Sequence, residues 1–259
     1  MLRRWVVLGM LVVVASVVVA ACGGGDDGSG LPDGASLVDL TTDDGFALVG
    51  ESYEGGEAWV LLGHMFTDDR GTWDPIAAGF AERGYSVLVW DFRCHGESAC
   101  VGETFSDGVP DIWRDWNAAL DYAVTEGATS VVAIGASMGG TSAIQVAADR
   151  DEIVAVGAIS SPNRFKGLDA LANYERVTVP KLFIVGADDM AAPKFSRRFH
   201  EEATGPSRLE VLPTDLHGNV LAVDAEFGPG IQALLYAFAA DPSGTVGDVV
   251  SAVRREGQP

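Results

Sequence analysis

The stretch VVAIGASMGGTSA, residues 131–143, decides how the rest of the sequence is interpreted. An apolar, β-branched run leads into Gly135, Ser137 and Gly139, and small and apolar residues follow. The pattern G-x-S-x-G is typical of a serine nucleophile on a sharp turn between a strand and a helix, where small second neighbours keep the two elements from colliding. A serine in an ordinary glycine turn would leave the same pattern, because glycine makes up 32 of the 259 residues. The surrounding sequence has to separate the two interpretations.

Short apolar runs alternate with helix-like segments from about residue 36 onward. Repeated alternation of this kind, with near-continuous apolar strands, predicts an α/β fold with a mostly parallel central sheet of about eight strands and helices on both faces. One predicted helix places Ile112, Trp116, Leu120 and Val124 four residues apart on a single face. The predicted strands are 36–40, 46–53, 58–62, 86–90, 131–134, 153–159, 181–185 and 208–212, and the predicted helices are 73–83, 111–125, 138–149, 193–203 and 231–240.

A base for Ser137 must come from the two histidines downstream, because in this architecture the order along the chain is serine, acid, histidine. His200 lies inside a predicted helix, KFSRRFHEEA, where a solvated histidine is the simpler interpretation. His217 follows the strand 208–212, and a loop there can carry it over Ser137. The sequence therefore predicts His217 as the base.

The acid is expected after the preceding strand, 181–185, because active sites of such sheets lie at the carboxyl ends of the strands. Asp188 and Asp189 follow that strand at once. Either carboxylate could orient the imidazole, as the serine–histidine–acid arrangement requires. This agreement in order and position favours a catalytic serine over a glycine turn.

Residues 36–240 resemble the α/β-hydrolase family, and most closely its small lidless serine esterases, including the dienelactone-hydrolase-like and serine-aminopeptidase-like branches. The stretch DFRCHGES, residues 91–98, resembles the family's D-x-R-G-x-G-x-S loop, with Cys94 where glycine is usual. The spacing Gly186-x-x-Asp189-x-x-x-Pro193 matches the family's acid motif and favours Asp189 over Asp188.

The resemblance also implies an oxyanion hole made by two backbone N–H groups. One belongs to Met138, the residue after the nucleophile. The other comes from the loop GHMF, residues 63–66, where analogy favours Phe66 and leaves Met65 as the alternative; Met65 stands where many relatives have glycine. His64 is expected to stabilise this loop and not to act as a base. No cofactor is implied, and no H-x-x-H or paired C-x-x-C spacing suggests a metal site.

Relatives with a lid carry a cap domain after the strand that follows the nucleophile helix. Here residues 160–180 separate two predicted strands, which is room for a loop and one short helix around residues 168–174. We therefore expect no cap domain and an open cleft, with Phe66 and Met190 beside the acyl group.

The N-terminus predicts export. A basic start, MLRR, precedes a mostly apolar stretch to Ala21, as in a signal peptide. Val19-Ala20-Ala21-Cys22 resembles the lipobox of bacterial lipoproteins, which implies cleavage before Cys22 and lipidation of its thiol. We expect a signal peptide at 1–21, a flexible tether at 22–35 and one domain at 36–259, held on the outer side of the cell membrane. The alternative is a plain N-terminal membrane anchor.

Two further expectations come from composition. The chain has 17 basic and 37 acidic residues and a net charge of −20, which makes nucleic acid a poor partner. Cys94 and Cys100 enclose a short loop, and disulfides persist in exported proteins. We predict that they pair; the alternative is two free buried thiols.

Together these features predict a lipid-anchored serine hydrolase that cleaves small carboxylic esters through an acyl-enzyme. Ser137 attacks, His217 moves the proton and Asp189 holds the imidazole. A non-catalytic surface lipoprotein that keeps the fold to bind a ligand is the rival of another class. Peptidase, thioesterase and cofactor-free haloperoxidase activities remain open, because they use the same three residues.

Overall fold

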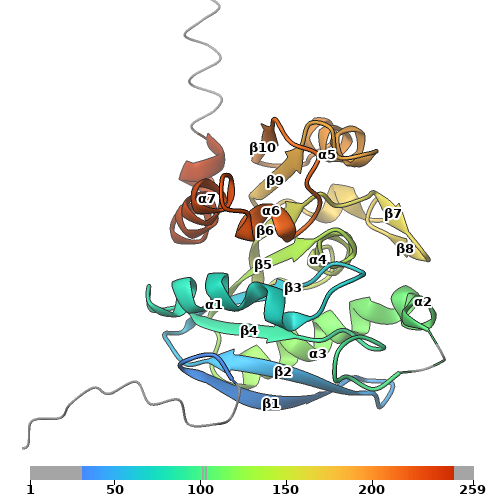
Figure 1. Ribbon diagram of the computed structural model, residues 1–259, viewed down its shortest axis with the longest axis vertical. Coiled ribbons are helices and arrows are strands. Elements are labelled where there is room, and N and C mark those ends of the chain that lie inside the picture. Colours follow the sequence, from blue (N-terminus) through green and yellow to red (C-terminus); the bar gives the residue numbers. More distant parts are fainter. Residues whose placement is uncertain (1–30, 101, 103, 248–259) are drawn as a thin grey trace, which may run out of the picture. The chain divides into compact units, whose positions relative to one another are not determined.

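An eight-stranded sheet runs through the computed structural model, which describes residues 31–100, 102 and 104–247. The strand order is β1-β2-β4-β3-β5-β6-β9-β10 (Figure 1). β1 and β2 pair antiparallel, β2 is antiparallel to β4, and every later pair is parallel, which confirms the predicted mostly parallel sheet. The strands are β1 (Ala35–Thr41), β2 (Ala47–Tyr53), β3 (Ala58–Gly63), β4 (Ser86–Trp90), β5 (Ser130–Ala136), β6 (Ile153–Ile159), β9 (Lys181–Gly186) and β10 (Ser207–Leu212).

Helices cover both faces of the sheet because side chains of the buried strands alternate between two apolar clusters. On β3, Trp59 and Leu61 join one cluster and Val60 and Leu62 the other. Side chains of α3, α4 and α5 complete the first cluster, and those of α1, α6 and α7 complete the second (Figure 1). The helices are α1 (Asp74–Ala81), α2 (Phe105–Gly108), α3 (Ile112–Thr125), α4 (Met138–Ala147), α5 (Ala192–Glu201), α6 (Val220–Val223) and α7 (Gly228–Ala240).

The predicted apolar face of α3 is wrong at its last position. Ile112, Trp116 and Leu120 are buried, but Val124 is 42% exposed and Ala123 takes its place in the core. Each step of four residues turns an α-helix by about 400°, so three steps shift the side chain by roughly 120° from the starting direction.

The segment between β6 and β9 forms a small hairpin instead of the predicted short helix. β7 (Arg164–Phe165) pairs antiparallel with β8 (Leu168–Asp169), and a 3-10 helix follows at Tyr174–Arg176. Lys166 and Gly167 both have positive φ angles, 44° and 99°, which is the backbone of a two-residue hairpin turn. No cap domain is evident between β6 and β9, all of whose residues the structure describes, as predicted.

A buried ion cluster fixes the loop that follows β4. The Arg93 side chain is fully buried, and its Nε donates to Asp115 Oδ1 at 2.7 Å. Asp115 Oδ2 also accepts the backbone N–H of Arg93 at 2.9 Å. The other two guanidinium nitrogens donate to Asp44, at 2.8 and 3.0 Å. Each of the three guanidinium nitrogens therefore has a carboxylate partner.

We expect Asp115→Ala to lower the free energy of unfolding by about 3–5 kcal/mol, because it leaves a buried guanidinium with one part-exposed carboxylate and a backbone N–H with no acceptor. The melting temperature followed by circular dichroism should fall by roughly 6–20 °C. The control is Asp43→Ala, which removes an exposed carboxylate that pairs with Arg114. Equal shifts for the two variants would contradict this account of Asp115.

Candidate active site

Ser137 occupies a strained turn between β5 and α4. Its backbone angles are φ 47° and ψ −113°, a left-handed conformation that costs a non-glycine residue about 1–3 kcal/mol. The Ser137 N–H donates to the carbonyl of Ile159 on β6 at 2.8 Å, which holds the turn at the carboxyl end of the sheet. The predicted strand–turn–helix context of the G-x-S-x-G pattern is present.

Gly135 and Gly139 are required by the close approach of strand, helix and the neighbouring loop. A Cβ at Gly135 would lie 2.4 Å from the backbone of Gly139 and Gly140. A Cβ at Gly139 would lie 2.4 Å from the carbonyl oxygen of Gly63, at the end of β3. Both contacts are shorter than a real Cβ tolerates, so a larger residue would displace the turn that carries Ser137.

The structure brings Ser137, His217 and Asp189 into one hydrogen-bonded chain. His217 Nε2 lies 2.9 Å from Ser137 Oγ, and His217 Nδ1 lies 2.8 and 2.9 Å from the two Asp189 oxygens. An ionised carboxylate only accepts, so Nδ1 carries the proton and Nε2 is free to accept from the serine hydroxyl. The arrangement can deprotonate Ser137 as it attacks an electrophile.

Burial separates the two candidate acids. Asp189 is 1% exposed and faces His217, whereas Asp188 is exposed and bonds only through its backbone: its N–H donates to the Thr214 carbonyl and its carbonyl accepts the N–H of Met190. His200 lies on α5, where its Nδ1 is 2.8 Å from Ser207 Oγ. Asp188 and His200 are therefore outside the cluster.

The N–H groups of Met138 and Phe66 have no hydrogen-bond partner among the described residues. Met138 is the first residue of α4, where backbone N–H groups are unpaired and the helix dipole is positive. The loop after β3 lies against this helix start, because the His64 carbonyl is 2.6 Å from the Cβ position of Gly139. The Met65 N–H is also without a partner, so hydrogen bonding alone does not separate Phe66 from Met65.

His64 holds this loop and is unsuited to act as a base. It is fully buried, its Nδ1 donates to the Met65 carbonyl at 2.7 Å, and its Nε2 accepts the N–H of Phe92 at 3.0 Å. Burial lowers the pKa of His64 to about 4, so the ring is neutral at physiological pH. The backbone at Met65 has no positive φ, so the methionine fits where many relatives have glycine.

His95 contacts the loop beside Ser137, a contact that the sequence did not predict. Its Nε2 lies 2.8 Å from the Phe66 carbonyl and its Nδ1 lies 3.0 Å from the Arg93 carbonyl. It therefore links the buried ion cluster of Arg93 to the loop beside Ser137. The only signal in the sequence was its place inside the stretch 91–98, two residues after Arg93.

Cys94 and Cys100 are joined by a disulfide in the structure, with an S–S distance of 1.99 Å. Cys94 has a φ of 65°, which explains why relatives favour glycine at this position. The bridge closes the loop that follows β4, next to His95.

Comparisons with known proteins address the fold as a whole. The sequence of residues 56–167 matches the family described as serine aminopeptidase, S33. No protein with a curated description matches the sequence. The structure resembles an esterase from Pyrococcus furiosus at a TM-score of 0.65 and 22% identity, over 79% of this chain and 89% of that chain. It resembles an enol-lactonase from Burkholderia xenovorans at 0.67 and 16%, over 79% and 100%. It also resembles an α/β hydrolase from a Penicillium species at 0.67 and 15%, over 83% and 100%.

The chain has the α/β-hydrolase fold. Within that fold, Ser137 is on the turn after β5, Asp189 follows β9 and His217 follows β10, all at the carboxyl edge of the sheet. At sequence identities this low, the structural similarity establishes only the arrangement of the backbone. The activity has to be argued from the site.

Two further features concern metal ions and membranes. No group of three or more histidine, cysteine, aspartate or glutamate side chains within the described part of the chain is arranged to hold a metal ion. None of the helices in residues 31–100, 102 and 104–247 is long and apolar enough to cross a membrane. Residues 1–30, including the predicted signal peptide, Cys22 and most of the tether, lie outside the described residues.

Proposed function

We propose that this protein is a serine hydrolase that cleaves small carboxylic esters through an acyl-enzyme. The observation that carries the proposal is the continuous contact from Asp189 through His217 to Ser137, at 2.8 and 2.9 Å. A serine hydroxyl becomes a useful nucleophile when a base accepts its proton and a third group orients that base.

The reaction follows from these contacts. Ser137 Oγ bonds to the ester carbonyl carbon while its proton passes to His217 Nε2, and Asp189 stabilises the imidazolium. The negative oxygen of the tetrahedral intermediate accepts hydrogen bonds from the N–H groups of Met138 and Phe66. The intermediate collapses, the ester C–O bond breaks, and the alcohol leaves with the proton from His217. Water then repeats the sequence on the acyl-enzyme and releases the carboxylic acid and free Ser137.

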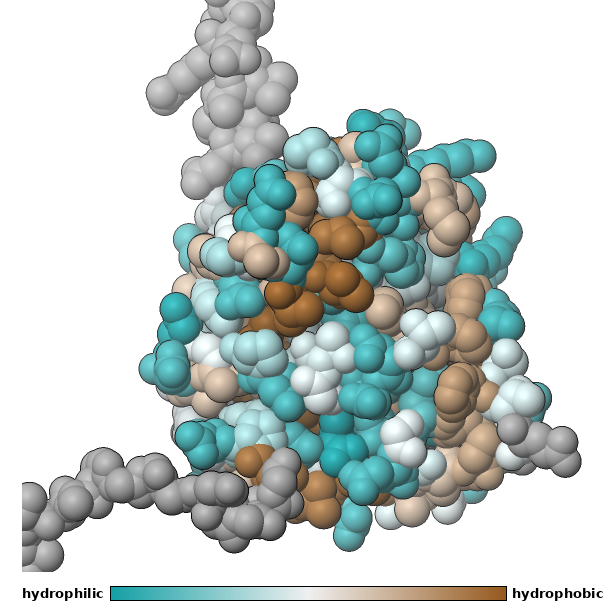
Figure 2. Space-filling model, in the orientation of Figure 1, coloured by the Kyte–Doolittle hydropathy of each residue, from teal (hydrophilic) through white to brown (hydrophobic). Residues whose placement is uncertain are grey.

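Small substrates suit the surroundings of Ser137. Figure 2 shows a hydrophobic area in the region of α6, the short helix after His217, where Val220 and Val223 are 37% and 39% exposed. The Met65 sulfur lies 2.7 Å from the Cβ position of Gly218, so another apolar side chain borders the histidine loop. Met190, which follows Asp189, is 91% exposed. No cap covers these apolar side chains, so they form an open surface. Such a surface can contact only a short acyl chain.

The test is hydrolysis of p-nitrophenyl esters of graded acyl length by the purified protein. Each methylene that is sequestered contributes about 0.8 kcal/mol, so kcat/KM should rise by roughly four-fold per methylene and stop once the chain outgrows the open surface. We expect the maximum at short acyl chains and no jump above substrate micelle formation, since no lid must open. Activity that climbs steadily to long chains would contradict the open cleft, and faster cleavage of aminoacyl anilides than of all esters would favour a peptidase.

We further propose that the protein is a lipoprotein on the outer side of the cell membrane. The support is the sequence Val19-Ala20-Ala21-Cys22 after an apolar segment with a basic start. Mass spectrometry of the native N-terminus should find a lipidated Cys22, and Cys22→Ala should release or misprocess the protein. An intact Met1 terminus would refute the anchor.

A further inference from the structure

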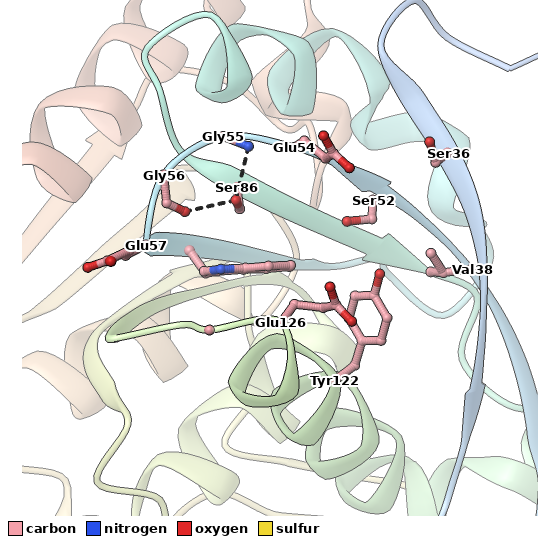
Figure 3. Close-up of a pocket in the computed structure, with 12 residues that line it drawn as sticks. Ser36, Val38, Ser52, Glu54, Gly55, Gly56, Glu57, Ser86, Tyr122 and Glu126 are labelled. Carbon is pink, nitrogen blue, oxygen red and sulfur yellow. Dashed lines mark hydrogen bonds between the residues drawn. The ribbon is translucent and has the colours of Figure 1, made fainter.

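A cavity of about 380 Å³ opens at the amino edge of the parallel strands, at the opposite end of the sheet from Ser137 (Figure 3). It lies between the strand pair β1–β2 and the C-terminal end of α3, above the first residues of β3 and β4. Its volume falls within the range of small-molecule sites. We call it the amino-edge pocket and define it by Ser52, Glu54, Trp59, Ser86, Tyr122 and Glu126.

The charge of the amino-edge pocket is entirely negative. Glu54, Glu57 and Glu126 line it, and no lysine, arginine or histidine does. None of the three carboxylates forms an ion pair with any basic side chain in the described part of the chain. The pocket also receives the C-terminal end of the 14-residue helix α3, where the helix dipole is negative. A cation is the ligand that this field favours.

Two aromatic rings and one serine hydroxyl of the amino-edge pocket indicate what kind of cation fits it. The rings of Trp59 and Tyr122 lie 6.1 Å apart at an interplanar angle of 79°, and aromatic faces attract organic cations. Ser52 is 6% exposed, yet its hydroxyl has no hydrogen-bond partner among the described residues and borders the cavity. Figure 3 shows the Ser52 and Tyr122 hydroxyls and the Glu126 carboxylate around the same space. The Ser52 oxygen is not one of the fully enclosed unpartnered atoms, so it reaches the open space of the cavity, where a polar group of a ligand can bond to it.

We propose that the amino-edge pocket binds a small organic ammonium ion. The ammonium group lies against the Trp59 and Tyr122 rings, Glu126 and Glu54 supply the counter-charge, and the Ser52 hydroxyl bonds to a polar group of the ligand. A bare divalent metal is a poorer fit, because such ions need several oxygens in close convergence and no described group of acidic side chains offers that. The proposal is independent of the ester hydrolysis proposed above.

The experiment is calorimetric titration of the complete protein with choline, beside 3,3-dimethyl-1-butanol, which has the same shape without the charge. We expect choline to bind with a dissociation constant of roughly 1 mM or tighter and the neutral alcohol to bind at least about ten-fold more weakly. Short-chain phosphatidylcholine below its micelle concentration separates the two sources of this chemistry. Binding of the lipid alone assigns the pocket to a lipid headgroup, and binding of both assigns it to the ammonium ion itself.

Glu126→Gln should weaken choline binding by about five-fold or more, because it removes one of the facing charges. The matched control is Glu82→Gln, since Glu82 is also an exposed glutamate at the C-terminal cap of a helix, α1, and lines no part of the pocket. Circular dichroism on both variants checks that the fold is intact. The proposal is overturned if neither choline nor the lipid binds, if the neutral alcohol binds as well as choline, or if the two variants behave alike.

Discussion

Replacing Ser137 with alanine is expected to lower kcat for ester hydrolysis by roughly 10⁶-fold, to the level that oriented binding and the oxyanion donors support without a nucleophile. The reason is geometric: the Ser137 hydroxyl is the only group placed 2.9 Å from His217 Nε2 in the described part of the chain. Steady-state hydrolysis of a short acyl ester measures the effect. A fluorophosphonate that labels the native protein at this serine should leave the variant unlabelled.

Ser160→Ala provides a matched control for that loss. Ser160 directly follows the neighbouring strand β6, has a positive φ of 52° and is fully buried, so it shares the setting of Ser137. Its hydroxyl, however, has no hydrogen-bond partner among the described residues and therefore no base. Activity within a few-fold of the native protein is expected. If Ser160→Ala is as inactive as Ser137→Ala, the loss reports damage to this edge of the sheet and the assignment of Ser137 fails.

The parts of the fold that the sequence could predict are those encoded locally. Apolar runs of five to seven residues identify buried strands, because a strand covered on both faces needs an apolar side chain at nearly every position. The turn at Ser137 was predictable for a similar reason, since Gly135 and Gly139 relieve contacts made within one strand–turn–helix unit. His217 lies 80 residues from Ser137 and was found only because its place after β10 brings it to the same edge.

The parts that could not be predicted depend on contacts between distant segments. The hairpin of β7 and β8 turns at Lys166, a residue that rarely takes a positive φ, so local propensity gave no signal for it. The link from His95 to the Phe66 carbonyl joins loops that follow two different strands. The amino-edge pocket draws on the ends of β2 and α3 and on the start of β3. Such assemblies follow from the strand order, which apolar periodicity does not specify.

Asp189→Asn is expected to lower kcat by roughly 10⁴-fold while Ser137 and His217 stay in place. The Asp189 carboxylate accepts from His217 Nδ1 through both oxygens, at 2.8 and 2.9 Å, which fixes the tautomer with a free Nε2. An asparagine amide can donate to Nδ1 instead, which moves the proton to Nε2 and blocks acceptance from Ser137. The imidazolium that forms during attack also loses its counter-charge. Steady-state kinetics with a short acyl ester measures the loss, and an unchanged melting temperature separates it from unfolding.

Asp188→Asn is the control, and it decides between two neighbouring carboxylates that the sequence alone ranks only by a motif. The variant removes the same charge one residue away, on an exposed side chain. The backbone N–H of residue 188 donates to the Thr214 carbonyl and is unaffected by the change. At the surface that charge is screened by solvent and salt, so kcat should change by no more than about two-fold. A large loss with Asp188→Asn and a small one with Asp189→Asn would mean that the loop after β9 presents the other carboxylate to His217 during catalysis. Large losses in both would mean that the two charges act together on the imidazolium, which the 1% exposure of Asp189 and its two-oxygen contact with Nδ1 argue against.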